Sequence, residues 1–568
     1  MTEAYAALET RAKEQWDAWV NSGKPRVFVQ TNSDSLAVGA QEVREAIVAA
    51  LAQHKVDATV TAVGSSGMTF ADVMVDIIKP GKPRVTYGFV TPETAGQLVT
   101  DVLADNKPRA DAALGVHADS AVDGIPPLKE HPFQKLQFPI VMKNFGHVEP
   151  GNLMHYIARD GYKALDKALG MEREAVRKEV DASVLRGRGG ALFPAATKWG
   201  FMMNAPKPKI LAVNGEEGDP GAFTDKAIAE NDPHMLLEGI LIGAYAMGID
   251  KTYIHIRAEY QVAVANLRRA LRELDEAGLV GHNVLSTPFT TEIEIEATGH
   301  AYICGEETAL MDSVEGKRGT PRPRPPFPAA YGIFGRPTNI NNVKTMSYVP
   351  QILLNGGAWF KKVGTEAATG TMFLSLSGTF KRRGFAEVPL GTPLKAVIED
   401  MCGGSSSDSP IKGLQTGGPL GGATSWEAAK DLKLEFAPLD GLGAPVGSGG
   451  IMAIDDHVCA VDLTLNLMEF NAAESCGKCF PCRKGTGHIV AKLRNIAAGH
   501  GGMGDLDEML AMGNTMRNGS LCGLGQLAPR IIIAMLRHFR PEFEAHIKDH
   551  VCRQGVCAVA EKTPVAVG

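Results

Sequence analysis

The run Glu474-Ser-Cys-Gly-Lys-Cys-Phe-Pro-Cys-Arg-Lys-Gly-Thr486 holds three cysteines at C-x2-C-x2-C spacing. A further cysteine follows in Ser520-Leu-Cys-Gly-Leu-Gly525. Three thiolates at this spacing can face one iron–sulfur cluster, and a distant fourth completes a four-thiolate [4Fe–4S] site. The predicted cluster ligands are Cys476, Cys479, Cys482 and Cys522.

Structural zinc is the alternative, because four cysteines also suit a tetrahedral zinc site. Zinc sites more often use two separated C-x2-C pairs, whereas a tight triad with a remote fourth cysteine favours a cluster. Since such a cluster moves one electron at a time, the run predicts a redox relay.

The composition limits the class of protein. A chain of 568 residues is too long for one domain, and its net charge of -6 argues against a general nucleic-acid binder. It has no apolar stretch long enough for a membrane span, and its acidic N-terminus does not resemble a signal peptide. Seven of the nine cysteines lie from Cys459 onward, which indicates metal ligands in a reducing compartment. We therefore expect a soluble cytoplasmic protein.

The pattern of the chain changes along its length. Short strand-like and helical runs fill the first 130 residues, and a proline-containing connector follows. Glycine-rich loops then alternate with apolar strands and long helices up to about residue 345, which is an α/β pattern. Short strands and turns occupy residues 370 to 450, and helical periodicity dominates from about 460 onward.

A second motif is the run Leu185-Arg-Gly-Arg-Gly-Gly-Ala-Leu-Phe-Pro-Ala-Ala-Thr-Lys-Trp199. Its glycines let backbone N–H groups approach an anion, and Arg188 and Lys198 add charge for a phosphate. It does not match the dinucleotide fingerprint, because Leu192 occupies the third glycine position. Taken alone, the run could also be a simple turn.

Three further loops carry charged or aromatic side chains. The loop at 214–225 packs four acids that could bind ribose hydroxyls or form a solvated turn. The segment at 301–311 places two acids between an apolar strand and a helix. The stiff basic loop at 319–328 suits either polyproline recognition or a lid over a flat ring.

In this order, the motifs resemble the NADH-binding, FMN-carrying [4Fe–4S] flavoprotein subunit of respiratory complex I and its relatives. Those relatives serve electron-bifurcating and NAD-reducing hydrogenases and NAD-dependent formate dehydrogenases (beta subunit). The resemblance spans about residues 140 to 545. It implies a multidomain α/β fold with a thioredoxin-like domain lacking a cluster at 1–132, an FMN- and NADH-binding α/β domain at 133–345, a ubiquitin-like β-grasp domain at 346–450, a helical [4Fe–4S] domain at 451–545 and a tail at 546–568.

The resemblance also assigns site residues by motif. The implied FMN contacts are Gly187, Arg188, Gly189, Gly190, Lys198, Asn214, Glu216, Glu217, Tyr302, Gly305, Glu306, Glu307, Asn341 and Asn342. The implied NADH contacts are Phe193, Phe201, Asp219, Arg324 and Phe327. No side chain is expected to act as a catalytic acid or base, because hydride transfer belongs to the flavin.

Several positions depart from the family pattern. Leu192 stands for a usual glycine, Asp219 for a usual glutamate, and Lys344 for the glutamate after the paired asparagines; Ala195-Ala196 replaces Thr-Gly. Ser65 and Thr69 occupy positions where cluster-bearing relatives have cysteines, so the first domain should lack a [2Fe–2S] cluster.

The carboxyl-terminal run His546-Ile-Lys-Asp-His-Val-Cys-Arg-Gln-Gly-Val-Cys557 adds Cys552 and Cys557. With His546 or His550 they supply three ligands for tetrahedral zinc, and Cys459 could be the fourth. This resembles the zinc site of the bifurcating branch. The alternative is a disordered tail in which Cys552 and Cys557 bind no metal.

The expected function is a diaphorase subunit that passes electrons between NAD(H), FMN and a [4Fe–4S] cluster in a larger soluble complex, with electron bifurcation as one option. The resemblance implies a small [2Fe–2S] thioredoxin-like subunit and a catalytic metal-containing subunit as partners, with ferredoxin as a further candidate. The alternative function is a non-catalytic iron–sulfur scaffold that has lost nucleotide binding.

Overall fold

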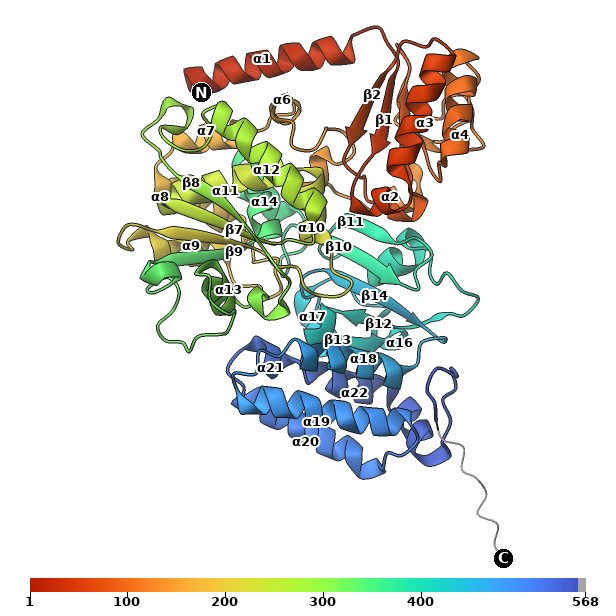
Figure 1. Ribbon diagram of the computed structural model, residues 1–568, viewed down its shortest axis with the longest axis vertical. Coiled ribbons are helices and arrows are strands. Elements are labelled where there is room, and N and C mark those ends of the chain that lie inside the picture. The colour runs from red at the N-terminus through yellow and green to blue at the C-terminus, as the bar shows by residue number, and fades with distance from the viewer. Residues whose placement is uncertain (560–568) are drawn as a thin grey trace, which may run out of the picture.

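A parallel four-stranded sheet, ordered β8-β7-β6-β9, organises the centre of the molecule. The computed structural model describes residues 1–559 and shows this sheet among helices, with two further sheets to one side of it (Figure 1). Its strands are β6 (Ile210–Gly215), β7 (Lys251–Arg257), β8 (Glu292–Thr298) and β9 (Thr338–Asn342).

Helices cover both faces of this sheet. Leu211 and Val213 of β6 face the main core, whereas Ile210 and Ala212 face a smaller cluster beside α13. This alternation follows from the two-residue period of a strand. The helices are α7 (Lys163–Leu169), α8 (Arg173–Ala182), α9 (Ala195–Met203), α10 (Thr224–Asn231), α11 (Pro233–Met247), α12 (Gln261–Glu276), α13 (Glu307–Val314), α14 (Val343–Asn355) and α15 (Gly357–Lys362).

The strand order reverses at β6. The chain proceeds from β6 through β7 to β8 on one side, and then places β9 on the other side of β6. Ligands of open parallel sheets bind at the carboxyl ends of the strands where such a reversal occurs. The candidate site should therefore lie where β6 and β9 end.

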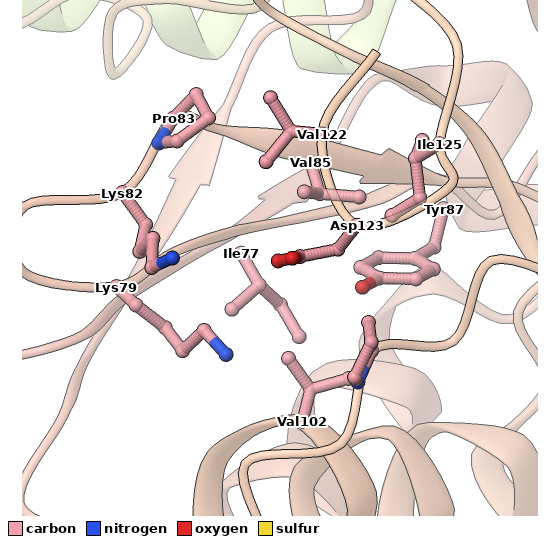
Figure 2. A pocket seen from close by; sticks show the side chains of 11 residues that line it. Ile77, Lys79, Lys82, Pro83, Val85, Tyr87, Val102, Val122, Asp123 and Ile125 are labelled. Carbon is pink, nitrogen blue, oxygen red and sulfur yellow. The ribbon is translucent and has the colours of Figure 1, made fainter.

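A mixed sheet ordered β2-β1-β3-β4-β5 forms the N-terminal unit, in which only β1 and β2 pair in parallel. A small pocket opens beside it, with Ile77, Val85 and Val102 in its wall and two lysine side chains near its rim (Figure 2). All its lining residues lie within 77–125, so it is separate from the central sheet. The elements are β1 (Arg26–Gln30), β2 (Thr59–Val63), β3 (Val75–Ile78), β4 (Val85–Tyr87), β5 (Ala113–Val116), α3 (Ala40–Gln53) and α4 (Pro92–Leu98).

A second mixed sheet follows the central unit, in the order β11-β10-β14-β12-β13. Its middle strand β14 runs parallel to β10 and antiparallel to β12. The strands are β10 (Thr371–Gly378), β11 (Gly384–Pro389), β12 (Ile411–Thr416), β13 (Gly422–Ser425) and β14 (Gly450–Asp455).

The last unit is helical, and α22 packs against β13 of the preceding sheet. The segment beyond α22 returns to it, where Cys552 and Cys557 pack on the helical core. Within residues 1–559, no helix is long and apolar enough to cross a membrane. The helices are α18 (Ala460–Ala473), α19 (Phe480–Ala497), α20 (Met503–Gly519), α21 (Gly523–Leu527) and α22 (Arg530–Glu544).

Packing crosses three of the expected domain divisions. Helix α1 (Glu3–Val20) packs on the central unit, with Tyr5 and Ala12 in the central core, and reaches the first sheet only at its end, where Trp19 stacks on Phe28 of β1. The expected boundary at 345 falls inside α14, whose Val349 and Ile352 belong to that same core. The boundary at 450 falls at the start of β14, which completes the third unit's sheet.

Helix α1 gives a test of this packing. The Tyr5 side chain is fully buried and its hydroxyl donates to the Gly161 carbonyl at 3.0 Å. We expect Tyr5→Ala to cost about 3–5 kcal/mol, because it leaves a cavity, and Tyr5→Phe about 1 kcal/mol. Chemical denaturation, with proteolytic release of residues 1–20, measures both. Equal stability of Tyr5→Ala and of the exposed control Glu14→Ala would contradict the assignment.

Candidate flavin, nucleotide and cluster sites

Loops from distant parts of the chain meet where β6 and β9 end. We call this meeting point the crevice, because parallel sheets bind ligands at such strand ends. Asn214, at the end of β6, donates from Nδ2 to the Gly305 carbonyl at 2.9 Å. Asn342, at the end of β9, approaches the glycine loop so closely that a Cβ on Gly189 would lie 2.9 Å from the Asn342 Cβ. Segments that are distant in the sequence therefore meet here, with their backbone and amide groups close together. This arrangement suits a ligand that is bound by direct contact with backbone N–H groups.

The glycine loop keeps its shape despite the leucine. Gly190 has φ +106° and Leu192 has φ +57°, both left-handed. This conformation favours glycine and costs other residues about 1–2 kcal/mol. The conformation explains why a glycine would suit position 192, and it shows that the leucine has not displaced the backbone from the left-handed region.

Arg188 does not face the crevice as expected. Its side chain is buried, and its guanidinium donates to the carbonyls of Thr369 at 2.8 Å, Arg186 at 3.0 Å and Thr371 at 3.3 Å. The three carbonyls hold the charge inside the protein. Arg188 therefore shapes the loop and ties it to the third unit, and its backbone N–H donates to the Thr345 hydroxyl at 2.9 Å.

The Glu217 and Glu306 side chains cap the first turns of two helices and do not face the crevice with free carboxylates. The Glu217 carboxylate accepts from the backbone N–H of Thr224 at 2.7 Å and Lys226 at 2.9 Å, at the start of α10. The Glu306 carboxylate accepts from the Thr308 N–H at 2.9 Å, at the start of α13. Both satisfy N–H groups that have no partner within the helix.

Glu216 is buried beside two histidines. Burial raises its pKa to about 7, because a charged carboxylate is disfavoured away from water. Its Oε1 lies 3.2 Å from His300 Nδ1, and His300 Nε2 lies 3.4 Å from Glu474 Oε1. His300 thus links the β6 loop to Glu474, two residues before the first cysteine of the triad. No sequence motif contains His300, so sequence reasoning missed it.

Loops of the third unit complete the crevice. The Tyr302 hydroxyl donates to Asp219 Oδ1 at 2.5 Å, and the Ser448 hydroxyl donates to Asp219 Oδ2 at 3.3 Å. Gly418 abuts the same carboxylate. Burial raises the pKa of Asp219 to about 6. Sequence reasoning missed Ser448, whose only signal was the glycine-rich turn at 447–450.

Lys344 is fully buried under this crevice. Its ammonium donates to the Thr224 hydroxyl and, at 2.8 Å, to the Ser448 carbonyl. It also lies 3.4 Å from Asp225 Oδ1, while Asp225 Oδ2 accepts from Asn342 at 2.6 Å. The substituted lysine is thus charge-balanced and holds the strand end to α10 and the 447–450 turn.

The open side of the crevice carries cations. Lys198 Nζ lies 3.4 Å from Glu307, and Arg324 lies 2.6 Å from the same carboxylate. Both cations can exchange Glu307 for an anionic ligand. Asn341, in contrast, is buried and donates to Asn339.

Exposed aromatic rings lie in the glycine loop, in α9 and in the basic loop at 319–328. The Phe193 and Phe201 rings are 6.3 Å apart, and both are about half exposed. Phe327 is similarly exposed, as are Tyr331 and Phe334, which sequence reasoning did not select. Such rings offer flat faces for stacking against a base.

The four predicted cluster cysteines line one small cavity. Arg318 donates to the Cys476 carbonyl at 2.8 Å, and Lys478 donates to the Pro321 carbonyl at 2.5 Å. These bonds hold the triad loop on the 301–322 segment of the central unit. Four thiols around one cavity fit a four-iron cluster bound by four thiolates.

A different arrangement joins Cys459, His546, Cys552 and Cys557. One ligand atom from each lies within 4.8 Å of the others. His546 Nδ1 donates to the Glu542 carbonyl at 2.7 Å, which orients Nε2 toward the Cys459 thiol 3.6 Å away. His546 and not His550 belongs to this set, which is compact enough for a single ion.

The loop that holds Ser65 and Thr69, where cluster-bearing relatives have cysteines, forms a packing contact between two units. The Ser65 backbone N–H donates to Asn231 Oδ1 at 2.6 Å, and Gly67 abuts the Phe385 carbonyl of β11. The 64–69 loop therefore lies wedged between the central unit and the third unit.

Comparison with known proteins identifies the two redox segments. Residues 180–351 match a family model described as the Nuo51 FMN-binding domain, and residues 462–546 match the NADH-ubiquinone oxidoreductase-F iron-sulfur binding region.

Relatives extend over most of the chain. It is 40% identical over 425 residues to the NADP-reducing hydrogenase subunit HndC of Solidesulfovibrio fructosivorans, covering 75% of this chain and 86% of that one. It is 40% identical to an NADH-quinone oxidoreductase subunit of Rhizobium meliloti (strain 1021), covering 73% and 99%. A crystal structure of an NAD+-reducing [NiFe]-hydrogenase in the H2-reduced state matches with a TM-score of 0.64 at 25% identity, covering 96% and 93%.

The matched segments coincide with the crevice and with the four-cysteine cavity. The chain therefore belongs to the family of FMN- and [4Fe–4S]-binding subunits of NADH-quinone oxidoreductases and their hydrogenase counterparts, oxidoreductase components that pass electrons between NAD(H), FMN and the cluster within multisubunit enzymes.

Proposed function

We propose that this chain binds FMN in the crevice at the ends of β6 and β9 and exchanges electrons between NAD(H) and the cavity of Cys476, Cys479, Cys482 and Cys522. The observation that carries the proposal is the meeting of the glycine loop, Asn214, Gly305 and Asn342 at the strand-order reversal. FMN converts hydride into single electrons, and a [4Fe–4S] cluster carries them one at a time. The chain positions both.

Each group of residues has a distinct role in this proposal. The backbone of the glycine loop and Lys198 hold the FMN phosphate, while Asn214, Glu216, Tyr302 and Asn342 surround the flavin. Asn341, which is buried against Asn339, supports the end of β9. Phe193, Phe201 and Phe327 stack on the NADH base, and Arg324 exchanges Glu307 for the pyrophosphate. Glu217, Glu306 and the Arg188 side chain support these loops from behind.

We assign the first sheet to a thioredoxin-like domain and the third unit to a ubiquitin-like β-grasp domain. The parallel pairing of β10 and β14 in the middle of an otherwise antiparallel sheet supports the second assignment. We place the protein in the cytoplasm, with a small [2Fe–2S] subunit and a catalytic metal-containing subunit as partners. The scaffold alternative is weaker, because the Leu192 and Lys344 substitutions leave the crevice intact.

The cluster assignment has a direct test. Cys522→Ser should abolish the EPR signal of a reduced [4Fe–4S] cluster, because one of four thiolates is lost. Flavin content should stay near one per chain, and NADH oxidation by a small dye should continue, because the flavin crevice is unchanged. Purified chain without flavin, or without dye reduction, would favour the scaffold function.

The nucleotide assignment is tested at Phe201. Phe201→Ala should raise the KM for NADH about ten-fold with little change in kcat, because base stacking contributes about 1–3 kcal/mol. Steady-state kinetics with a dye acceptor measures this effect. Phe89→Ala, at an exposed ring in the N-terminal unit, is the matched control. An unchanged KM would remove Phe201 from the site.

We also propose zinc for Cys459, His546, Cys552 and Cys557. Three thiolates and one imidazole are a common zinc donor set. Cys557→Ser should lower zinc to well below one per chain while iron stays at the wild-type value, as measured by elemental analysis of the purified chain. Loss of iron and zinc together would show that the two sites are not independent.

A further inference from the structure

The exchange of electrons at the crevice leaves a proton to be moved. Oxidation of NADH gives NAD+, two electrons and one proton, and an iron–sulfur cluster carries only the electrons onward. In the opposite direction the same proton has to be supplied. Several groups at the crevice are buried, so this proton needs a path of side chains that connects the interior with water.

Glu216 is a buried carboxyl fixed beside the crevice. Its backbone N–H donates to Asn214 Oδ1 at 3.0 Å, and its carbonyl oxygen would lie 3.7 Å from a Cβ on Gly305. These are the two residues that meet at the end of β6. Within residues 1–559, the Glu216 Oε2 atom has no hydrogen-bond partner. The carboxyl therefore has an oxygen free to take up a proton.

Two histidines flank this carboxyl. His300 Nδ1 lies 3.2 Å from Glu216 Oε1, within reach of proton transfer, whereas His255 Nδ1 lies 3.8 Å from Oε2. His255 is fully buried, and its Nε2 lies 3.0 Å from the Ser313 hydroxyl. The His300 side chain is 25% exposed. The carboxyl thus has a closed side at His255 and an outlet to water at His300.

His300 is held so that each ring nitrogen has a partner. Its Nε2 lies 3.4 Å from Glu474 Oε1, and its backbone N–H donates to Glu259 Oε1 at 3.0 Å. A Cβ on Gly218 would lie 3.2 Å from His300 Cε1, so the ring packs on the loop that carries Glu216. A neutral imidazole accepts a proton at one nitrogen and donates one at the other, as a proton shuttle requires.

The surroundings of Glu216 suit proton exchange near neutral pH. Burial is the main cause that raises the pKa of Glu216 to about 7. The charges of Glu259 and Glu474 act in the same direction, and Arg257 acts against them. Burial lowers the pKa of His255 to about 4, so this ring stays neutral. The other titratable groups that face Glu216 are Tyr260 and Cys304.

We propose that Glu216 and His300 form a proton path between the crevice and water. The Glu216 carboxylate takes up the proton left by NADH and passes it from Oε1 to His300 Nδ1, while His300 Nε2 releases its own proton to water. Exchange with water then returns the ring to its first tautomer. The reverse sequence supplies the proton when NAD+ is reduced. The inference rests on the proposed function, because it needs hydride exchange in the crevice.

The first test follows the proton directly in the full holoprotein. NADH and two ferricyanide ions give NAD+, two ferrocyanide ions and one proton, and a pH indicator in weak buffer reports that proton in a stopped-flow experiment. In the wild type, the proton should reach water as fast as ferrocyanide forms. His300→Gln should slow proton release, and turnover with it, about 100-fold, because an amide can hydrogen-bond Glu216 but cannot carry a proton.

Two further readouts separate a proton path from a structural role. Infrared spectra of the resting holoprotein should contain a protonated-carboxyl band that disappears as the pH rises through about 7 and is missing in Glu216→Gln. Imidazole added to His300→Ala should raise turnover toward the wild-type rate, because the free ring can replace the missing side chain. A His300 that only supports the loop would give no such rescue.

The control variant is His282→Gln, which removes an exposed histidine elsewhere on the central unit and should change none of these readouts. Flavin content and the cluster EPR signal of the His300 variants should stay at wild-type values. Proton release from His300→Gln at the wild-type rate would overturn the proton path, as would loss of flavin from that variant, which would make the ring structural. Failure of the imidazole rescue, or identical infrared titrations of wild type and Glu216→Gln, would also overturn it. A wild-type chain that lacks flavin or does not reduce ferricyanide would instead overturn the proposed function itself.

Discussion

The contact between the loop before the cysteine triad and the loop after β8 joins the two redox sites. The Glu474 carboxylate accepts from the Tyr302 backbone N–H at 3.0 Å and lies 3.4 Å from His300, which also reaches Glu216. Arg318 returns the contact by donating to the Cys476 carbonyl. Single electrons must pass between the crevice and the cysteine cavity. Electron transfer through the chain therefore depends on this junction, which sets the relative position of the two sites.

In the crevice, charged side chains and backbone groups have different structural roles. Charged side chains in its motifs, such as Arg188 and Glu217, are held by backbone groups behind the site. Glycine backbone and amide groups face the ligand instead. A buried charge is stable only when it is paired or hydrogen-bonded, so these side chains act as rigid supports. The ligand then meets groups whose positions are already fixed.

Local patterns predicted the chemistry better than the boundaries. The triad spacing and the glycine loop selected the correct segments, because ligand spacing and backbone freedom are local properties. The packing positions of α1 and β14 could not be predicted from the local sequence, because each element packs against another that lies far away in the sequence. His300 carries no motif, and its role is visible only once Glu216 and Glu474 are brought together.

The departures from the family pattern change charge more than shape. Leu192 accepts the left-handed backbone that a glycine would take, so the loop is retained at a small energetic cost. Lys344 places a buried ammonium where the resemblance implies a carboxylate, next to Asp225 and the strand end of Asn342. Coulomb interactions are strong where water is excluded. Lys344 is therefore held by the nearby Asp225 carboxylate, and the surrounding hydrogen bonds preserve the geometry of the site.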